Sequence, residues 1–143
     1  MPTAIFPVPG TKAYRGAWQE TVRAAEEANE PGRFTAFIGY EWTSGGANNL
    51  HRNVIFRDNG DKASQVEPYT TIKPLGSDNP ADLWKWMAAY EEKTGGNVLA
   101  IAHNGNVSNG RMFPTVEDFG KKIDRAYAEE RIKWERLYEV TQT

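Results

Sequence analysis

The sequence contains no cysteine, and this absence removes several kinds of chemistry. Disulfide bridges, zinc–thiolate sites and cysteine nucleophiles are all excluded from a chain of 143 residues that lacks the thiol. A chain without cysteine fits a reducing compartment as well as an oxidising one. The absence of cysteine therefore does not indicate where the protein is located, and its localisation stays unknown.

Long apolar runs and clusters of basic residues are also absent. The apolar runs are far shorter than the roughly 20 residues of a membrane-spanning helix. The first residues, MPTAIFPVPGTK, are too short and too interrupted by proline for a signal peptide. Lysine and arginine, 17 in all, form no stripe or cluster, and the net charge is −2. We therefore expect neither a membrane nor a nucleic acid as a partner.

What the chain does contain is enough apolar material for a folded domain. Hydrophobic residues make up 39% of the sequence, and five tryptophans argue against disorder. A length of 143 residues corresponds to about one domain. We expect a single soluble domain over residues 1–143, in which the proline- and glycine-rich residues 1–11 form an irregular lead-in.

The spacing of apolar residues predicts alternating helices and strands. Three helices are expected, over residues 12–29, from the cap at 77–80 to the glycines at 95–96, and over 123–136. Four strands are expected, over residues 34–42, 50–57, 98–102 and 137–141. A turn at 44–49 joins the first two strands into a β-hairpin, and residues 58–77 form a surface loop or lid. This order predicts an α/β fold with parallel crossover units.

Three ionisable residues mark the ends of the expected strands. Glu41 lies at the carboxyl end of its strand, and His103 follows the apolar strand VLAIA. His51 opens the strand that returns from the hairpin, so we expect it at the same edge of the sheet. In parallel α/β folds ligands bind beyond this edge. The chain has only two histidines, and both are predicted to lie there.

Imidazole nitrogens and carboxylate oxygens are ligands of zinc, manganese, iron and similar divalent ions. Such an ion lowers the pKa of a bound water to about 7, which makes hydroxide available for hydrolysis. The three residues therefore predict a divalent metal site. Taken alone, each histidine could equally have a structural role at the end of a strand. Metal binding is favoured only because both histidines and Glu41 are expected at the same end of the sheet.

The loop after His103 is rich in asparagine and glycine. Its amides are candidates for binding a small-molecule substrate or for orienting His103; they belong to Asn104, Asn106 and Asn109. The alternative is a tight turn, because asparagine and glycine tolerate positive φ. Glu139 approaches the same edge near the end of the last strand. We expect Glu139 to have a structural or ion-paired role, with support of a metal ligand as the second possibility.

Five segments of the chain resemble a known protein family. They are FIGYEWTS, NLHRNVIFRDNG, DLWKWM, LAIAHNGNVSNGRMF and WERLYEVTQ. The family is bacterial, is catalogued as a domain of unknown function, and is similar to the PHP (polymerase and histidinol phosphatase) metal-dependent hydrolases. The resemblance extends from about Ala17 to the end of the chain.

The resemblance implies a distorted (β/α)7 barrel with a cluster of two or three metal ions at the carboxyl ends of its strands. It implies metal ligands at Glu41 in GYEW, at His51 on the next segment, and at His103 in AHN. The PHP superfamily also uses a His-x-His pair on its first strand and an Asp-x-His pair on its last, and this sequence has neither. We therefore expect an interior part of such a barrel, without its first and last strands.

Two functions from different classes follow. The first is the segment of a metal-dependent hydrolase that cleaves phosphoester-type bonds through a metal-bound water. Arg52 and Arg111 would then be candidate contacts for an anionic, possibly phosphorylated substrate. The second is a non-catalytic chain that acts only as a self-associating fold or binding module. In either case the open strand edges of a partial barrel predict a homo-oligomer, and the isolated chain is expected to be a weak catalyst or none.

Overall fold

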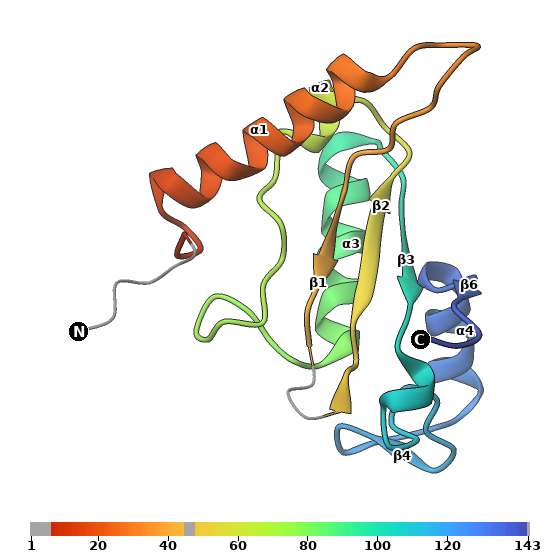
Figure 1. The fold of residues 1–143 in the computed structure, drawn as a ribbon. Helices are drawn as coiled ribbons and strands as arrows, with labels where there is room; N and C mark the ends of the chain where they lie inside the picture. Colours follow the sequence, from red (N-terminus) through yellow and green to blue (C-terminus); the bar gives the residue numbers. More distant parts are fainter. Residues whose placement is uncertain (1–6, 45–47, 143) are drawn as a thin grey trace.

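The structure is a computed structural model that describes residues 7–44 and 48–142 (Figure 1). Part of the expected lead-in and the middle of the expected hairpin turn fall outside these residues. Among the helices that the structure describes, none is long and apolar enough to span a membrane.

A four-stranded sheet forms the centre of the molecule. Its strands are β1 (Gly39–Trp42), β2 (Arg52–Phe56), β3 (Val98–Ala102) and β6 (Leu137–Tyr138), in the order β1-β2-β3-β6. Strand β2 is antiparallel to both of its neighbours, whereas β6 is parallel to β3. A separate two-stranded sheet pairs β4 (Glu117–Asp118) with β5 (Lys121–Lys122).

Helices lie along one side of the sheet and beyond its edge (Figure 1). They are α1 (Lys12–Ala28), α2 (Gly60–Ala63), α3 (Pro80–Thr94), α4 (Arg125–Trp134) and a short 3-10 helix, η2 (Gly105–Val107). Helix α3 begins as its sequence predicts, because the side chain of Asn79 accepts a hydrogen bond from the Ala81 N–H at 3.0 Å. It ends at Gly95, whose φ of 62° is the left-handed conformation that favours glycine.

Side chains alternate between the two faces of the sheet. On β2, Val54 and Phe56 are buried against the helices, while Asn53 and Ile55 are only half-buried on the other face. The buried face packs against apolar side chains of α1 and α3; these are Trp18, Val22, Leu83, Trp84, Met87 and Tyr90. We call this side the covered face, and the side that carries Glu41, Asn53, Ile55, Leu99 and Ile101 the open face.

The mixed α/β class is confirmed, but the expected set of parallel crossover units is reduced to one in the described residues. Helix α3 joins β2 to β3, which are antiparallel, so the only parallel crossover in the described part of the chain runs from β3 through α4 to β6. The difference arises because β2, the second strand of the hairpin, lies between β1 and β3 and is antiparallel to both. The residues that the structure describes do not form a closed barrel.

The first strand is shorter than expected. It begins at Gly39, and the preceding aromatic side chains Phe34 and Phe37 are 59% and 62% exposed. The expected start of this strand at residue 34 is therefore wrong, because residues 34–38 precede β1 and the helices do not cover these aromatic side chains.

Residues 58–77 contain the short helix α2 and are fixed against the covered side of the fold. The Tyr14 hydroxyl donates to the carbonyl of Pro68 at 3.1 Å, and the Tyr69 N–H donates to the Tyr40 hydroxyl at 3.0 Å. Thr71 donates to the carbonyl of Thr43 at 3.0 Å. This segment is therefore tied to α1 and β1.

Candidate metal centre

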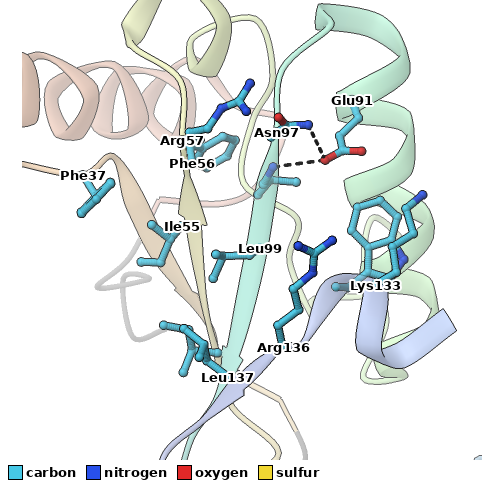
Figure 2. A pocket seen from close by; sticks show the side chains of 13 residues that line it. Phe37, Ile55, Phe56, Arg57, Glu91, Asn97, Leu99, Lys133, Arg136 and Leu137 are labelled. Carbon is cyan, nitrogen blue, oxygen red and sulfur yellow. Dashed lines mark hydrogen bonds between the residues drawn. The ribbon is translucent and has the colours of Figure 1, made fainter. Parts of the chain in front are cut away.

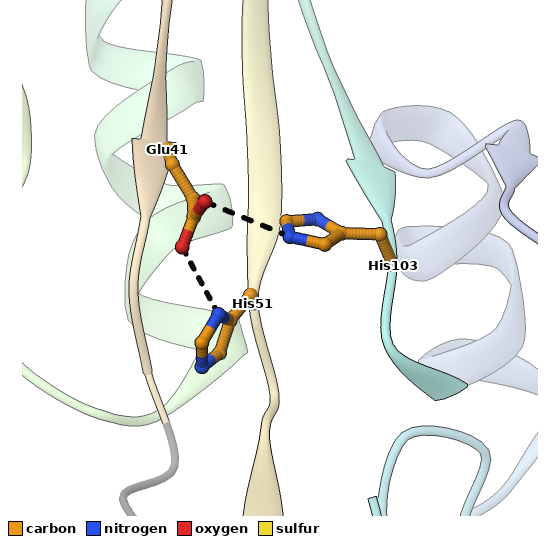
Figure 3. A group of neighbouring side chains, drawn as sticks. All are labelled: Glu41, His51 and His103. Atoms are coloured by element: carbon orange, nitrogen blue, oxygen red, sulfur yellow. Dashed lines mark ion pairs between the residues drawn. The ribbon is translucent and has the colours of Figure 1, made fainter. Parts of the chain in front are cut away.

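The antiparallel strand β2 brings both histidines to one end of the sheet, where β2 begins and β3 stops. His51 directly precedes β2 and His103 directly follows β3, and the His103 N–H donates to the His51 carbonyl at 3.2 Å. Glu41 lies on β1, opposite Asn53 of β2. All three side chains stand on the open face, as Figure 3 shows. The predicted convergence at one edge is present in the structure.

The carboxylate of Glu41 lies between the two imidazole rings (Figure 3). Its Oε1 is 3.0 Å from Nδ1 of His51, and its Oε2 is 3.7 Å from Nε2 of His103. The two rings stand edge to face, with centroids 5.7 Å apart and planes at 87°. Each carboxylate oxygen therefore faces a different histidine nitrogen.

These donor atoms fit a single divalent ion. One ligand atom from each of the three residues lies within 4.8 Å of the others. Two ligands that are each about 2.1 Å from one ion lie at most about 4.2 Å apart. Both glutamate–histidine separations are below this limit, through different carboxylate oxygens, whereas the 4.8 Å spacing of the whole group exceeds it. The side chains would therefore draw closer together to hold one ion. Two imidazoles and one carboxylate also form a ligand set that catalytic zinc sites use.

Burial differs across the three ligands. The side chain of His103 is 11% exposed, and its Nδ1 has no hydrogen-bond partner among the described residues. The side chain of Glu41 is 43% exposed, and that of His51 is 18% exposed. The centre is therefore closed on the side of His103 and open to solvent on the side of Glu41, where a ligand could approach.

Two polar side chains orient the ligands. The Thr43 hydroxyl donates to Oε1 of Glu41 at 2.7 Å. Nδ2 of Asn104 is 3.5 Å from Nδ1 of His51. Thr43 was not expected at the site, although it follows Glu41 by two residues, and the two-residue period of a strand places such a residue on the same face.

Glu139 supports the site indirectly. Its Oε2 accepts a hydrogen bond from the Asn104 N–H at 3.1 Å, and its own N–H donates to the Ala102 carbonyl at 2.9 Å. Asn104 has a φ of 67° and thus adopts the left-handed conformation that was the alternative for this loop. Glu139 is not one of the three clustered donors, and its expected role stays a prediction.

The other two asparagines hold the surrounding loops. Asn106 exchanges hydrogen bonds with the backbone of Gln142, at 3.0 and 2.8 Å. Nδ2 of Asn109 donates to Oδ1 of Asn48 in the hairpin at 3.3 Å. The amides of this loop thus connect it to the end of the described chain and to the hairpin, and their predicted role in substrate binding stays a prediction.

The structure does not bring Arg52 to the site. The alternation along β2 places it on the covered face, where it is 1% exposed. Its Nε is 3.0 Å from Oε1 of Glu135, and its Nη1 donates to the Leu50 carbonyl at 2.6 Å. A guanidinium that is buried in this way is not available to a substrate anion, so the expectation for Arg52 is wrong.

Glu135 is the centre of a buried ion cluster at the end of α4. It accepts from Nε1 of Trp84 at 2.9 Å and from Nε of Arg131 at 3.0 Å, besides Arg52. Burial alone would raise the pKa of the Glu135 carboxyl, but the charges of Arg52 and Arg131 outweigh it and hold this pKa below its ordinary value. The sequence did not indicate this cluster, because its members come from three separate elements, namely β2, α3 and the end of α4.

The side chain of Arg111 contacts an aromatic ring. It is exposed, and its guanidinium lies over the ring of Phe119, 5.3 Å from the ring centroid. Nothing in this position tests the expectation that it contacts an anion.

The comparisons with known proteins give one result. The family model described as "Protein of unknown function (DUF3604)" matches residues 4–143. The chain belongs to this family. No curated protein and no solved structure matches the chain. The predicted family of unknown function is therefore confirmed, whereas its similarity to the PHP hydrolases stays a prediction.

Proposed function

We propose that this DUF3604 chain carries the metal centre of a metal-dependent hydrolase that acts on phosphoester-type bonds. The observation that supports the proposal is the meeting of Glu41, His51 and His103 at one edge of the open face, with their donor atoms within 4.8 Å. The composition adds weight, because the chain has only two histidines and both are in this group.

Each residue of the centre has a defined part in the proposal. Glu41, His51 and His103 hold a zinc, manganese or iron ion. Such an ion supplies Lewis acidity and lowers the pKa of a water to about 7. Thr43 fixes one oxygen of Glu41, and Asn104 stands at His51, so both restrict how the ligands can rotate. The exposed side of Glu41 admits the substrate.

The fold proposed for the intact enzyme is a PHP-like barrel, of which this sheet would be one wall. The open face would then face the barrel interior. PHP enzymes use more ligands than three, so we propose that the chain alone binds one ion and turns over substrate slowly or not at all.

Metal content tests the proposal. The purified chain should retain, or bind on titration, about one zinc or manganese ion per molecule, measured by plasma mass spectrometry and calorimetry. The double variant His51→Ala/His103→Ala should lose this ion. Glu41→Gln should weaken binding, and Glu92→Gln, an exposed carboxylate on α3, is the matched control that should not. Hydrolysis of bis(p-nitrophenyl) phosphate by the loaded chain then tests the reaction.

The absence of a tightly bound ion from the unaltered chain and from the double variant alike would overturn the proposal. An ion that remains in the double variant would place the metal elsewhere on the molecule.

A second candidate function is a non-catalytic, self-associating fold or binding module. Two observations favour it. The outer edges of β1 and β6 have no partner strand in the described residues. Apolar side chains in and after β6 are also exposed, with Leu137 56% and Val140 83% exposed. This function predicts no tight metal and no turnover. Light scattering after size exclusion should then show an oligomer, and a monomer at high concentration would count against it.

A further inference from the structure

The open face of the sheet carries a hollow, and the candidate metal ligands are not among the residues that line it. Its volume is about 660 Å³, within the range of roughly 300–1,000 Å³ that small-molecule sites occupy. Four aliphatic side chains from three adjacent strands form its floor; they are Ile55, Leu99, Ile101 and Leu137. Figure 2 shows Ile55 and Leu99 beside each other on β2 and β3.

The strand register makes this floor continuous with the metal ligands. Asn53 pairs with Glu41 on one side and with Ile101 on the other, so Ile101 lies in the same row as the glutamate. The next row of the open face pairs Ile55 with Leu99. An apolar group that lies on this floor would therefore point one end toward the metal centre.

Positive charge lines the far end and the side of the hollow. Arg57 follows β2, and Lys133 and Arg136 lie at the end of α4 and just before β6; all three are exposed. Among the residues described, neither Arg57 nor Arg136 forms an ion pair. Lys133 lies over the ring of Trp134, 4.2 Å from the centroid. The two arginines are thus available to pair with an anion.

One carboxylate, that of Glu91, also lines the hollow, but it is already used within the chain. Its Oε1 accepts hydrogen bonds from Nδ2 of Asn97 at 3.2 Å and from the Val98 N–H at 3.4 Å. Three cations therefore face one engaged carboxylate around an apolar floor. This charge pattern selects a ligand that is apolar along its body and negatively charged at one end.

We propose that this hollow binds an amphipathic anion, whose apolar body lies on Ile55, Leu99 and Ile101 and whose charged end pairs with Arg57, while Arg136 lines the side of the hollow. The inference rests on the proposed function for one point only, namely that the opposite end of the ligand is the bond hydrolysed at Glu41, His51 and His103. Arg57 follows Asn53 by four positions, which corresponds to roughly 13 Å of extended strand. The apolar body of the ligand would span this length. The substrate class would be esters with a long apolar group and a second, distant anion.

Calorimetry with an unreactive probe tests the binding site separately from the reaction. Decanoate, below its micelle concentration and in the presence of a chelator, should bind once per chain. Decyltrimethylammonium has the same chain with the opposite charge, and butyrate has the same charge without the long chain. Both should bind weaker by a factor on the order of ten or more.

Two variants remove the two features of the site. Arg57→Ala/Arg136→Ala changes only exposed side chains, so its fold should be kept, and it should weaken decanoate binding on the order of tenfold. Leu99→Asp places a negative charge on the floor and should abolish binding. Lys121→Ala/Lys122→Ala removes two exposed cations that do not line the hollow, and it should leave binding unchanged.

Failure of this inference can be told apart from failure of the metal proposal. The variant His51→Ala/His103→Ala should still bind decanoate, even though it should lose the metal. Equal binding of decanoate and decyltrimethylammonium, or unchanged binding by the arginine variant, would overturn the inference. A stable dimer that decanoate neither binds nor dissociates would also overturn it, because a second copy of the chain would then occupy the open face.

Discussion

The two faces of the sheet are built from the same strands but have opposite surroundings. On the covered face, Val54, Phe56 and Ala100 are completely buried under α1 and α3. On the open face, the residues between them leave a hollow and present Glu41 with a side chain that is 43% exposed. The comparison teaches that stability comes mainly from one face and that the candidate chemistry lies on the other.

Charged groups follow the same division. The covered face holds Arg52 and Glu135, each with a side chain only 2% exposed, in a closed ion cluster. The open face holds the carboxylate and imidazoles of the candidate metal centre, together with arginines that have no ion pair in the described structure. Charges on the covered face satisfy each other, whereas those on the open face are available to a ligand. The predictions below test this division.

The largest effect is expected from Glu135→Ala. This change leaves Arg52 charged and buried without its partner, and loss of one partner of a buried pair costs about 3–5 kcal/mol of unfolding free energy. Glu129→Ala is the matched control, because Glu129 is on the same helix in an exposed pair with Arg125; it should cost less than about 1 kcal/mol. Urea unfolding measures both, and equal losses would contradict the division of the charges.

Truncation of one leucine on each side of the sheet compares their packing. Leu83→Ala removes a fully buried side chain of α3 and should cost about 2–5 kcal/mol. Leu99→Ala truncates a half-buried side chain of the open face and should cost clearly less, because solvent already reaches the site. Chemical denaturation of both variants gives the difference. Equal costs would mean that something covers the open face in solution.

Acid should weaken the covered face through Glu135. The pKa of this carboxyl in the folded chain lies below its ordinary value of 4.5. The stability it contributes is therefore complete above pH 4.5 and is lost as the pH falls through the lower, folded-state pKa. Unfolding midpoints between pH 7 and pH 3 should fall less steeply in Glu135→Gln than in the unaltered chain. Parallel profiles would exclude Glu135 as a source of the acid sensitivity.

The smallest effect is expected at Asn104, whose φ is 67°. Asn104→Ala should cost about 1 kcal/mol, because a side chain with Cβ is strained in this conformation. Asn104→Gly should cost little, since glycine adopts it freely. Both variants remove the amide near His51 and should weaken metal binding by the same factor. If only the alanine variant weakened binding, loop strain rather than the amide would be responsible.

Much of the fold was predictable because its signals are local. The four-residue spacing of Trp18 and Val22 predicted α1, and Asn79 with Pro80 predicted the start of α3. The apolar run VLAIA predicted β3 at its observed bounds. The three candidate ligands were also found from the sequence, because each ionisable residue stands at the end of a predicted strand and the hairpin returns His51 to the same edge.

The sequence by itself thus determined α1, α3, β3 and the group of Glu41, His51 and His103, since each depends on residues a few positions apart. Only the tertiary structure decided which face of each strand is covered. That choice exposed Phe34 and Phe37, buried Arg52 beside Glu135, and left Arg57 and Arg136 around an apolar floor. These pairings join residues that are distant in the chain, and no local pattern records which of them will meet.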